Sequence, residues 1–558
     1  MLDKLSSELL ARVLRHLLPQ PHDAAAFRRC YVRCGAEMGP LHAARLVCRA
    51  SAAAAREHLA AAVTLTPRNT RRSRATPDWP RFPGLRVVRV EGWNPKTAPV
   101  VLPRDAEQLL GACFGYAPAD AGAPLKGFDP GHLSRVTVLK VVRSDIFVDH
   151  LASALARLPA LKAVTIIGGV RSASKVCRAL SGATGLERLA LPDVPADAAL
   201  CAAAGLDGLS RLEALTLGQL NLEVGSLPGG LTAVAFRRQF EIGYHQPVCA
   251  WPALFDAASR LVELRGVHLE LDTAAALARS APRLRVLVCT PMGALWAPPR
   301  AGPWPCVFPC ITHACFFSRY EAAAADIRAA PLPAMLPALE QLASTDVHPY
   351  PSFVGLTGLR ALSLSDVEFD PFDVEAVQWD ALGALPRLTE MDVYLDPRDP
   401  VQLAGLVRLT NLEVLKVTVM AFARSDEVHI DMGAVMEAVA CLPLLHTVQI
   451  KVQQFENGNC MVKWGLSGLR RFAHGAPALH YLSIQVNEWG GVPAPVVGAL
   501  AMHTGLRRLL VDCSHEEPSA VDALAAEVSA ECNSLTIEPY SSSCLVQVCA
   551  WREGAWED

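Results

Sequence analysis

Apolar residues return in one short pattern along most of the chain. A turn residue comes first, and apolar residues then stand at positions i, i+3 and i+5, as in "TGLERLAL" at Leu186. The last two positions alternate with polar ones, which predicts a short strand with one buried face. Clear copies begin at Leu85, Val136, Leu161, Leu186, Leu212, Leu231, Leu284, Leu359, Leu388, Leu412, Leu445, Leu479 and Leu506, and weaker ones at Leu261 and Leu339.

Half of the chain is apolar, so such a triplet alone is common by chance. The regular spacing of the copies and the helical stretches before them are what make the pattern significant. Three successive steps from Val136 to Leu212 are 25, 25 and 26 residues long. Amphipathic stretches such as "DTAAALARSAP" and "GAVMEAVACLP" precede many copies, so a period of 3.6 gives way to a period of 2 across a Pro or Gly turn. "ITHACFF" from Ile311 is a possible hidden copy, whereas the gap between Leu85 and Val136 holds no convincing one.

This arrangement resembles the leucine-rich repeat family, over roughly residues 80–540. The resemblance implies an α/β fold, a solenoid with a curved parallel sheet and helices on its convex side. The Asn that usually follows the strand is mostly missing, and Val194, Leu220 and Val367 stand in its place. The copies are therefore more similar to the intracellular, helix-backed class. Helical HEAT-type repeats are the alternative, but they do not explain the strand pattern.

In the first 65 residues, the apolar positions follow helical spacing instead of the repeat pattern. Leu5, Leu9, Val13, Leu14 and Leu17 share one helical face, and Ala55, Leu59 and Ala62 are expected to continue a third helix. "LSSELLARVLRHLL" and the later "AARLVCRAS" resemble the F-box, although Ser6 and Ser51 replace its proline and tryptophan. The simpler alternative is that these helices only cap the first repeat.

The F-box resemblance implies docking to the Skp adaptor of a cullin-type (SCF) ubiquitin ligase. The residues that would bind the adaptor are Leu5, Leu9, Leu10, Val13, Leu14, Leu17, Leu46 and Val47. The expected domains are an F-box-like module at 1–65, a basic linker at 66–82, the solenoid at 83–540 and a C-terminal cap at 541–558. Within the cap, "CLVQVCAW" is expected to add a terminal strand, and Cys532–Ile537 is a possible final copy.

Composition and charge bear on the partner and on the compartment of the protein. The 558 residues are 51% hydrophobic and carry a net charge of −3. Residues 1–75 hold 13 Lys and Arg against 5 Asp and Glu, which leaves a net charge of −11 on residues 76–558. An acidic body argues against a nucleic-acid partner. Without an 18-residue apolar run or a secretory leader, and with its 17 cysteines scattered in apolar segments, the chain is expected to be cytoplasmic, with the nucleus as an alternative.

Three local features are candidates for a metal-binding or partner-binding site. Cys306, Cys310, His313 and Cys315 carry zinc-ligand chemistry, but their spacing fits no common finger, and a buried repeat segment is the preferred interpretation. The arginine-rich stretch 67–81 is either an import or phosphate patch or a solvated hinge. Tryptophans on loops are typical partner anchors, and the candidates for substrate binding are Trp296, Trp304 and Trp489, although they could equally pack against the solenoid.

No nucleophile elbow, P-loop, dinucleotide-binding glycine run or H-E-x-x-H motif occurs, so no catalytic residue, metal or cofactor is expected and the chain is predicted not to be an enzyme. The first hypothesis is a substrate-recognition subunit of a cullin ligase. The second is a leucine-rich-repeat scaffold for protein interactions. The alanine-rich composition is similar to that of green-algal members of the repeat family, some of which associate with the ciliary axoneme of the cytoskeleton.

Overall fold

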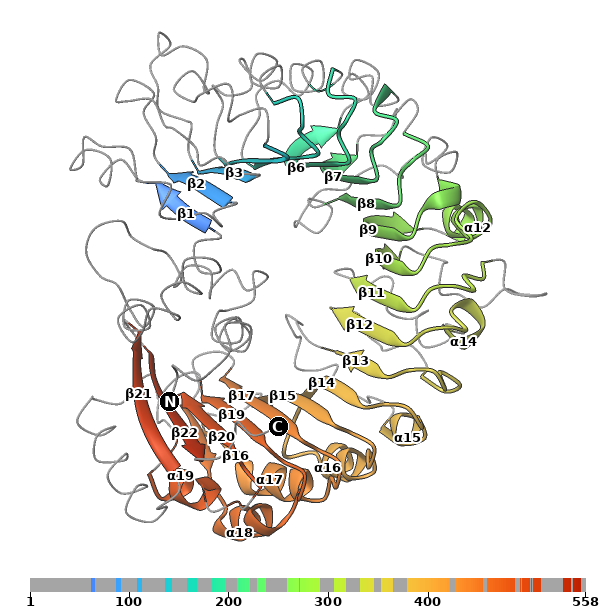
Figure 1. The fold of residues 1–558 in the computed structure, drawn as a ribbon. Helices are drawn as coiled ribbons and strands as arrows, with labels where there is room; N and C mark the ends of the chain where they lie inside the picture. The colour runs from blue at the N-terminus through green and yellow to red at the C-terminus, as the bar shows by residue number, and fades with distance from the viewer. Residues whose placement is uncertain are drawn as a thin grey trace, which may run out of the picture. The chain divides into compact units, whose positions relative to one another are not determined.

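The computed structural model divides into two compact units, residues 1–268 and 269–558, and each is described by itself. The residues that the structure describes are 62–65, 87–91, 108–112, 136–142, 158–167, 180, 182–196, 208–220, 228–236, 258–269, 271–291, 306–317, 332–345, 353–364, 379–421, 427–454, 459–486, 492, 494–501, 503, 505–512, 535–542 and 545–552. The strands of both units appear as successive arrows in Figure 1.

The first unit is built on parallel strands that pair in chain order. Its strands are β1 (Ala62–Leu65), β2 (Val87–Glu91), β3 (Gln108–Ala112), β4 (Val138–Val142), β5 (Ala163–Ile167), β6 (Arg188–Ala196), β7 (Ala214–Leu220), β8 (Ala233–Phe236) and β9 (Glu263–Leu269). Each pairs in parallel with the next, and a short 3-10 helix, η5 (Ala258–Arg260), precedes β9. Parallel neighbours require a crossover connection between strands, which is what the repeat length provides.

The second unit continues the same design with helices between its strands. The parallel strands are β10 (Val286–Pro291), β11 (His313–Phe317), β12 (Gln341–Thr345), β13 (Ala361–Ser363), β14 (Glu390–Leu395), β15 (Val414–Ala421), β17 (Thr447–Gln454), β19 (Tyr481–Val486) and β20 (Arg508–Asp512). The helices are α12 (Leu271–Ser280), α14 (Leu332–Met335), α15 (Trp379–Gly383), α16 (Pro400–Val407), α17 (Met432–Ala440), α18 (Leu466–His474) and α19 (Ala494–Ala501). They lie on one side of this unit's sheet (Figure 1).

The repeat leucine sets where each strand begins. In every copy from Val136 to Leu506, including Ile311, the strand starts two residues after the first apolar position, and that position is at most 4% exposed. In most of these copies, the carbonyl of the next residue accepts two backbone N–H groups from the following repeat. Glu413 O, for example, accepts from His446 N at 2.9 Å and Thr447 N at 3.1 Å. The strand positions expected from the sequence, the hidden copy at Ile311 included, are confirmed.

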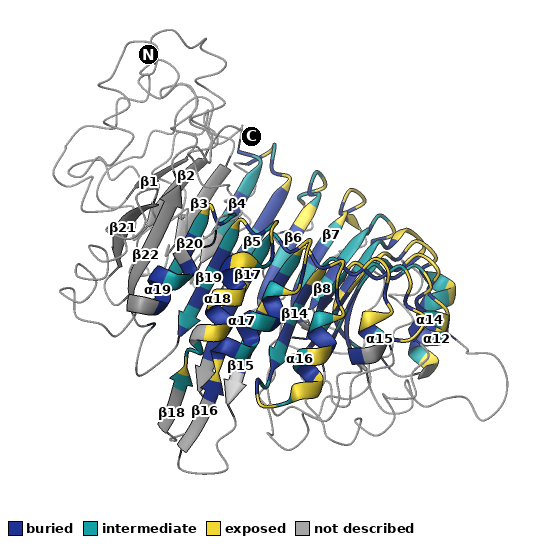
Figure 2. Cartoon of the chain, turned by 90° about the horizontal axis from the view of Figure 1, so that it is seen from below, coloured by how far each residue is buried: buried dark blue, intermediate teal, exposed yellow. Residues whose placement is uncertain are grey.

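Helix starts follow ordinary capping chemistry. The Asp399 carboxylate accepts a hydrogen bond from Val401 N at 2.8 Å, and Pro400 begins α16, where a missing N–H costs nothing. Asp431 caps α17 in the same way through Ala434 N at 3.3 Å. In Figure 2, α16 carries exposed residues as well as buried ones, whereas α17 is buried or half-buried along its length. The predicted helices at "DTAAALARSAP", "GAVMEAVACLP" and "VVGALAMHTG" are confirmed as α12, α17 and α19.

Two expectations near the N-terminal end are wrong. Ala62 does not continue a helix, because Ala62–Leu65 is β1 and pairs in parallel with β2. The gap between Leu85 and Val136 does hold a repeat strand, β3. Its signal was weak because Ala106 stands two residues before the strand, where other copies have leucine, and Gly111 takes the last apolar position.

The C-terminal end departs from the repeat. "CLVQVCAW" does form a terminal strand, β22 (Leu545–Arg552), but it lies between β20 and β21 (Leu535–Ser542) and is antiparallel to both. The stretch after Cys532 is therefore not a further parallel copy, and the expected boundary at 540–541 falls inside β21. Pro539 in β21 lacks a backbone N–H, a feature typical of strands at sheet edges.

A small second sheet accompanies two repeats of the second unit. β16 (Glu427–Asp431) and β18 (Asn459–Lys463) pair in parallel, and each leads directly into a helix, α17 and α18. The sequence pattern did not predict these strands.

Candidate protein-interaction surface

Alternation along the strands divides the sheet of the second unit into two faces. In β14, Met391, Val393 and Leu395 are buried, whereas Glu390, Asp392 and Tyr394 are exposed or half-buried. Odd and even positions of a strand point to opposite sides, so the second set lies on the face away from the helices. We call this face the open face. Its residues on β14, β15, β17, β19 and β20 are Glu390, Asp392, Tyr394, Val414, Lys416, Thr418, Thr447, Gln449, Lys451, Tyr481, Ser483, Gln485, Arg508 and Leu510.

The register fixes which of these side chains are neighbours. Glu390, Val414, Thr447, Tyr481 and Arg508 stand side by side in one row, and Asp392, Lys416, Gln449, Ser483 and Leu510 form the next. Backbone groups within these strands already pair with the strands on either side. A partner would therefore meet the open face through side chains rather than by adding a strand to it.

Charge on the open face changes sign once, between β14 and the strands that follow it. β14 contributes the carboxylates of Glu390 and Asp392, whereas Lys416, Lys451 and Arg508 follow on β15, β17 and β20. The guanidinium of Arg508 lies over the Tyr481 ring, 5.5 Å from its centroid. Both residues are half-buried. A stacked guanidinium of this kind has less freedom than one at the end of an unsupported side chain.

A row of ionisable groups runs beside the open face, one residue before each strand. Its members are Glu413, His446, His480 and Arg507, each fixed by the carbonyl ladder described above. His446 Nε2 lies 3.7 Å from Glu413 Oε2, and His446 Nδ1 lies 3.0 Å from Thr447 Oγ1. Partial burial lowers the pKa of His480, and Arg507 and His446 lower it further. Protonation of His480 adds a positive charge beside Arg507.

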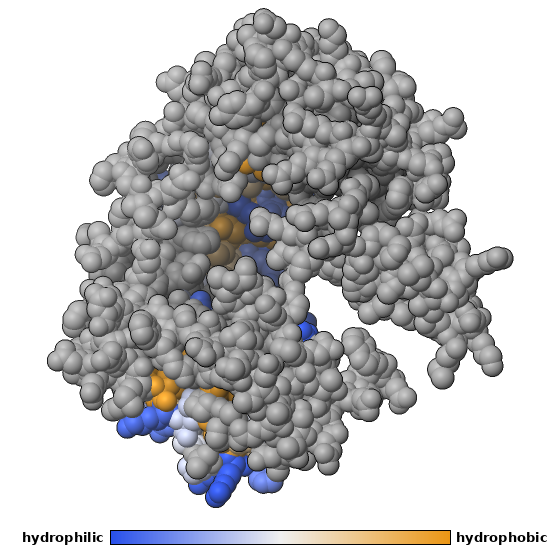
Figure 3. Space-filling view, turned by 90° about the vertical axis from the view of Figure 1, so that its left-hand side faces the viewer, coloured by the Kyte–Doolittle hydropathy of each residue, from blue (hydrophilic) through white to orange (hydrophobic). Residues whose placement is uncertain are grey.

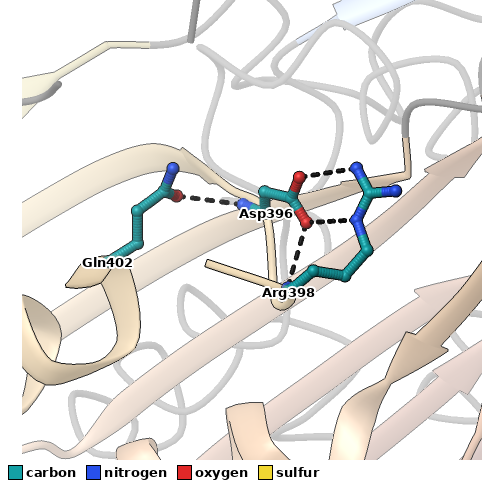
Figure 4. A network of polar contacts seen from close by, with 3 residues as sticks. All are labelled: Asp396, Arg398 and Gln402. Carbon is teal, nitrogen blue, oxygen red and sulfur yellow. Dashed lines mark hydrogen bonds and ion pairs between the residues drawn. The ribbon is translucent and has the colours of Figure 1, made fainter. Parts of the chain in front are cut away.

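The loop after β14 is held by its own polar contacts (Figure 4). The Arg398 guanidinium donates to both carboxylate oxygens of Asp396, from Nε at 2.9 Å and from Nη2 at 2.7 Å. The Asp396 N–H donates to Gln402 Oε1 at 3.0 Å, and Gln402 is only 5% exposed. This end of the acidic strand is thereby tied to α16.

The first unit presents a counterpart with mostly shorter side chains. The corresponding strand positions there are mostly alanine and threonine. They are Val138, Lys140, Ala163, Thr165, Arg188, Ala190, Ala214, Thr216, Ala233, Ala235, Glu263 and Arg265. One residue before the strands, Lys162 Nζ lies 2.9 Å from Glu187 Oε1, and this hydrogen bond lowers the pKa of Glu187. The second unit therefore offers the richer chemistry for recognition.

The site residues predicted from the sequence lie outside the described residues. These are the adaptor-binding Leu5, Leu9, Leu10, Val13, Leu14, Leu17, Leu46 and Val47, and the substrate-binding Trp296, Trp304 and Trp489. The arginine-rich stretch 67–81 lies outside them as well. The open-face residues were not singled out, although they could have been found by reading the polar positions inside each copy, such as Lys416 in "TNLEVLKV".

The cysteine-histidine cluster belongs to a repeat strand and the turn before it. Cys306 is fully buried, Cys310 is exposed, and His313 and Cys315 are half-buried on β11. Over the ranges described here, no three His, Cys, Asp or Glu side chains gather as a group that could hold a metal ion. None of the helices in those ranges is long and apolar enough to cross a bilayer. Where described residues reach the surface in Figure 3, hydrophilic side chains lie beside hydrophobic ones.

Comparison with known proteins gives two distant structural similarities and no sequence match. No model of a protein family matches the sequence, and no curated protein matches it either. Among solved structures, the TLR13–ssRNA13 complex is similar with a TM-score of 0.38 and 13% identity, over 76% of this chain and 61% of that one. The Drosophila Toll–Spatzle complex is similar with a TM-score of 0.24 and 13% identity, over 82% of this chain and 48% of that one. The chain thus spans less than two thirds of either receptor chain. The repeating strand-and-turn unit, with a buried apolar residue, most often leucine, two residues before the strand, is that of a leucine-rich-repeat solenoid.

Proposed function

We propose that this protein binds a partner protein through its repeats and acts as the substrate-recognition subunit of a cullin-type ubiquitin ligase. The repeats hold the target, the N-terminal module binds a Skp-type adaptor, and the chain itself performs no chemistry. The proposal places the protein in the cytoplasm, with the nucleus as the second compartment. Its partners are the adaptor with its cullin complex and a target protein, and neither nucleic acid nor a membrane is among them.

The open face supports the proposal that the repeats bind a target protein. It combines carboxylates, cations and tyrosines on a sheet whose strands are fixed to their neighbours by the repeated carbonyl ladder. Tyrosine and arginine are enriched in protein interfaces, and rigid strands present them at low entropic cost. This single observation carries the assignment to protein recognition.

The F-box-like sequence supports the adaptor half. Leu46 and Val47 stand where the F-box pattern has its "LV", and Leu5, Leu9 and Leu10 match its opening helix. Apolar anchors on a short helical module suit a groove in a partner, with a polar rim around them.

Replacing Leu46 and Val47 together with Asp is expected to abolish adaptor binding. Burial of two aliphatic side chains is worth roughly 3–6 kcal/mol, which corresponds to about a hundredfold or more in affinity. The measurement is calorimetric titration of the full chain with a Skp-type adaptor. Replacing Trp296 and Trp304 with Ala serves as the matched control and should leave adaptor affinity unchanged.

The alternative is a leucine-rich-repeat scaffold that uses its repeats alone, in the cytoskeleton or at the ciliary axoneme. Complete absence of adaptor binding by the wild-type chain at micromolar concentration would reject the ligase half. Recovery of one stoichiometric partner by the same chain would then favour the scaffold.

A further inference from the structure

The cations of the open face lie on three of its strands. Lys416 is on β15, Lys451 is on the neighbouring β17, and Arg508 is on β20, which β19 separates from β17. Arg507 stands beside the open face, one residue before β20. We call these four residues the basic strip. Strands lie about 4.8 Å apart, so the strip spans roughly 14 Å across the sheet.

The two lysines sit close enough to act together. Lys416 is in register with Gln449, and Lys451 is in register with Thr418, two residues further along β15. One strand separation and a two-residue rise place their Cα atoms roughly 8 Å apart. In the part of the chain described here, neither ammonium group forms an ion pair within 4.0 Å. Both charges lie on the same face.

An acidic border limits the strip on one side. Asp392 on β14 is directly in register with Lys416, and Glu390 lies in the neighbouring row. Residues 76–558 carry a net charge of −11, so a group of four cations stands out from its surroundings. A matching ligand therefore needs negative charge over β15–β20 and either neutral or positive charge over β14.

We propose that the basic strip docks an extended acidic segment of the partner protein, lying across strands β15 to β20. This inference rests on the proposed protein-binding function and names the chemistry of the partner. The register places Arg508 two strands and four residues from Lys451, so roughly 16 Å separate their Cα atoms. Extended chain advances about 3.3 Å per residue, so about seven or eight residues reach from Lys416 past Lys451 to Arg508 and bring carboxylates to all three. The Arg508 guanidinium, already stacked on Tyr481, offers a forked donor of the shape that a carboxylate accepts.

An acidic peptide fits this surface better than a nucleic acid. A phosphate backbone carries a charge at every nucleotide and needs a long basic track, whereas the strip is only four strands wide and ends at Glu390 and Asp392. A peptide, by contrast, can place its acidic residues over the strip and a neutral or basic residue over β14.

The test uses the full chain and a fluorescein-labelled ten-residue peptide with Glu at alternate positions. Fluorescence anisotropy should show binding to the wild type, and the double variant Lys416→Glu/Lys451→Glu should lose about tenfold or more in affinity. Lys463→Glu is the control for negative charge added elsewhere, with half the charge change of the double variant, because Lys463 is exposed on β18 in the other sheet, and it should bind like the wild type. The same peptide with Lys in place of Glu should prefer the double variant, a reversal that a folding defect cannot produce.

Acidification provides a second readout. His480 lies beside the strip, and its burial together with Arg507 and His446 lowers its pKa, so its protonation adds positive charge only at a pH below that at which an ordinary histidine titrates. Peptide affinity should rise as the pH falls toward 5.5, while carboxylates of the peptide stay ionised.

Three results would overturn the proposal. One is equal affinity of the Glu peptide and its Gln counterpart for the wild type. Another is equal loss in Lys463→Glu and in the double variant. The third is tighter, strip-dependent binding of a ten-nucleotide oligouridine, which would make the strip a nucleic-acid site. A partner captured by the full chain and held equally by the double variant would reject the docking site and leave the protein-binding function intact.

Discussion

Each buried position of the repeat sets a requirement on its side chain, and residues that depart from the pattern show what that requirement is. Most copies put an apolar residue three places before the repeat leucine, but His503 stands there before Leu506 and is 1% exposed. Its Nε2 lies 2.9 Å from Gly475 O, and Gly505 N donates to its Nδ1 at 3.2 Å. These partners make Nε2 the protonated nitrogen, and the ring packs on Phe472 with centroids 5.1 Å apart. A polar side chain therefore occupies a core position because both of its nitrogens find partners.

Gly266 in β9 is the clearest single-residue requirement. Its φ is +73°, and a Cβ there would come within 1.8 Å of Phe236 O. Gly266→Ala should lower the free energy of unfolding by about 1–3 kcal/mol or more, because both the backbone conformation and the space exclude a side chain. Urea denaturation followed by circular dichroism measures the loss.

The control for that variant is Gly229→Ala in the same unit, where a Cβ would meet nothing within 4 Å. It should be neutral or slightly stabilising, since alanine restricts the unfolded chain. Equal stability of the two variants would contradict the requirement at Gly266.

At the scale of elements, glycines let neighbouring helices of the second unit approach. A Cβ on Gly468 of α18 would lie 2.0 Å from Gly433 O of α17, and one on Gly405 of α16 would lie 2.3 Å from the Trp379 side chain of α15. Strands repeat every 4.8 Å or so, whereas helices normally need 8–10 Å. Close helix contacts therefore reduce the mismatch between the two layers.

Gly468→Ala is expected to destabilise the second unit by about 1–3 kcal/mol, although alanine alone favours a helix. The added methyl meets backbone atoms of α17, which cannot move aside as a side chain can. Hydrogen exchange should show faster opening of α17 and α18. Ser467→Ala, at an exposed position of the same helix, should leave exchange unchanged, and the same exchange rates in both variants would argue against the close contact.

At the scale of the whole molecule, stability is shared between neighbouring repeats. Leu362 in β13 is 2% exposed and lies between Leu342 of β12 and Met391 of β14 in register. Each repeat buries its apolar residues against the next. Damage to one repeat therefore also weakens its interfaces with both neighbours, and several repeats lose stability together.

Leu362→Asp is therefore expected to unfold several repeats together. A buried carboxylate without a partner costs several kcal/mol, and the loss spreads to both neighbours. Hydrogen exchange with peptide-level resolution should show lost protection from β12 to β14 at least. Ala361→Asp, on the open side of the same strand, is the control and should keep that protection. Damage confined to β13 would contradict the coupling.

The strand positions could be read from the sequence because they depend on local periodicity. Apolar residues at i, i+3 and i+5 after a turn place each strand two residues after its leucine, and this holds wherever the pattern was recognised. β3 was not predicted because Ala106 and Gly111 replace larger apolar residues of the repeat pattern. The chemical types of the open face are likewise present in the sequence, between the apolar positions.

The tertiary structure alone decided what depends on pairing between distant segments. The order of β20, β22 and β21 requires an antiparallel insertion that no local pattern encodes. The register brings Asp392 beside Lys416, and Lys416 diagonal to Lys451, although they are separated by 24 and 35 residues. The sequence by itself determined the repeat, because side-chain periodicity is local. Only the stacking of strands decided which polar side chains share a surface, because hydrogen-bond register acts between repeats.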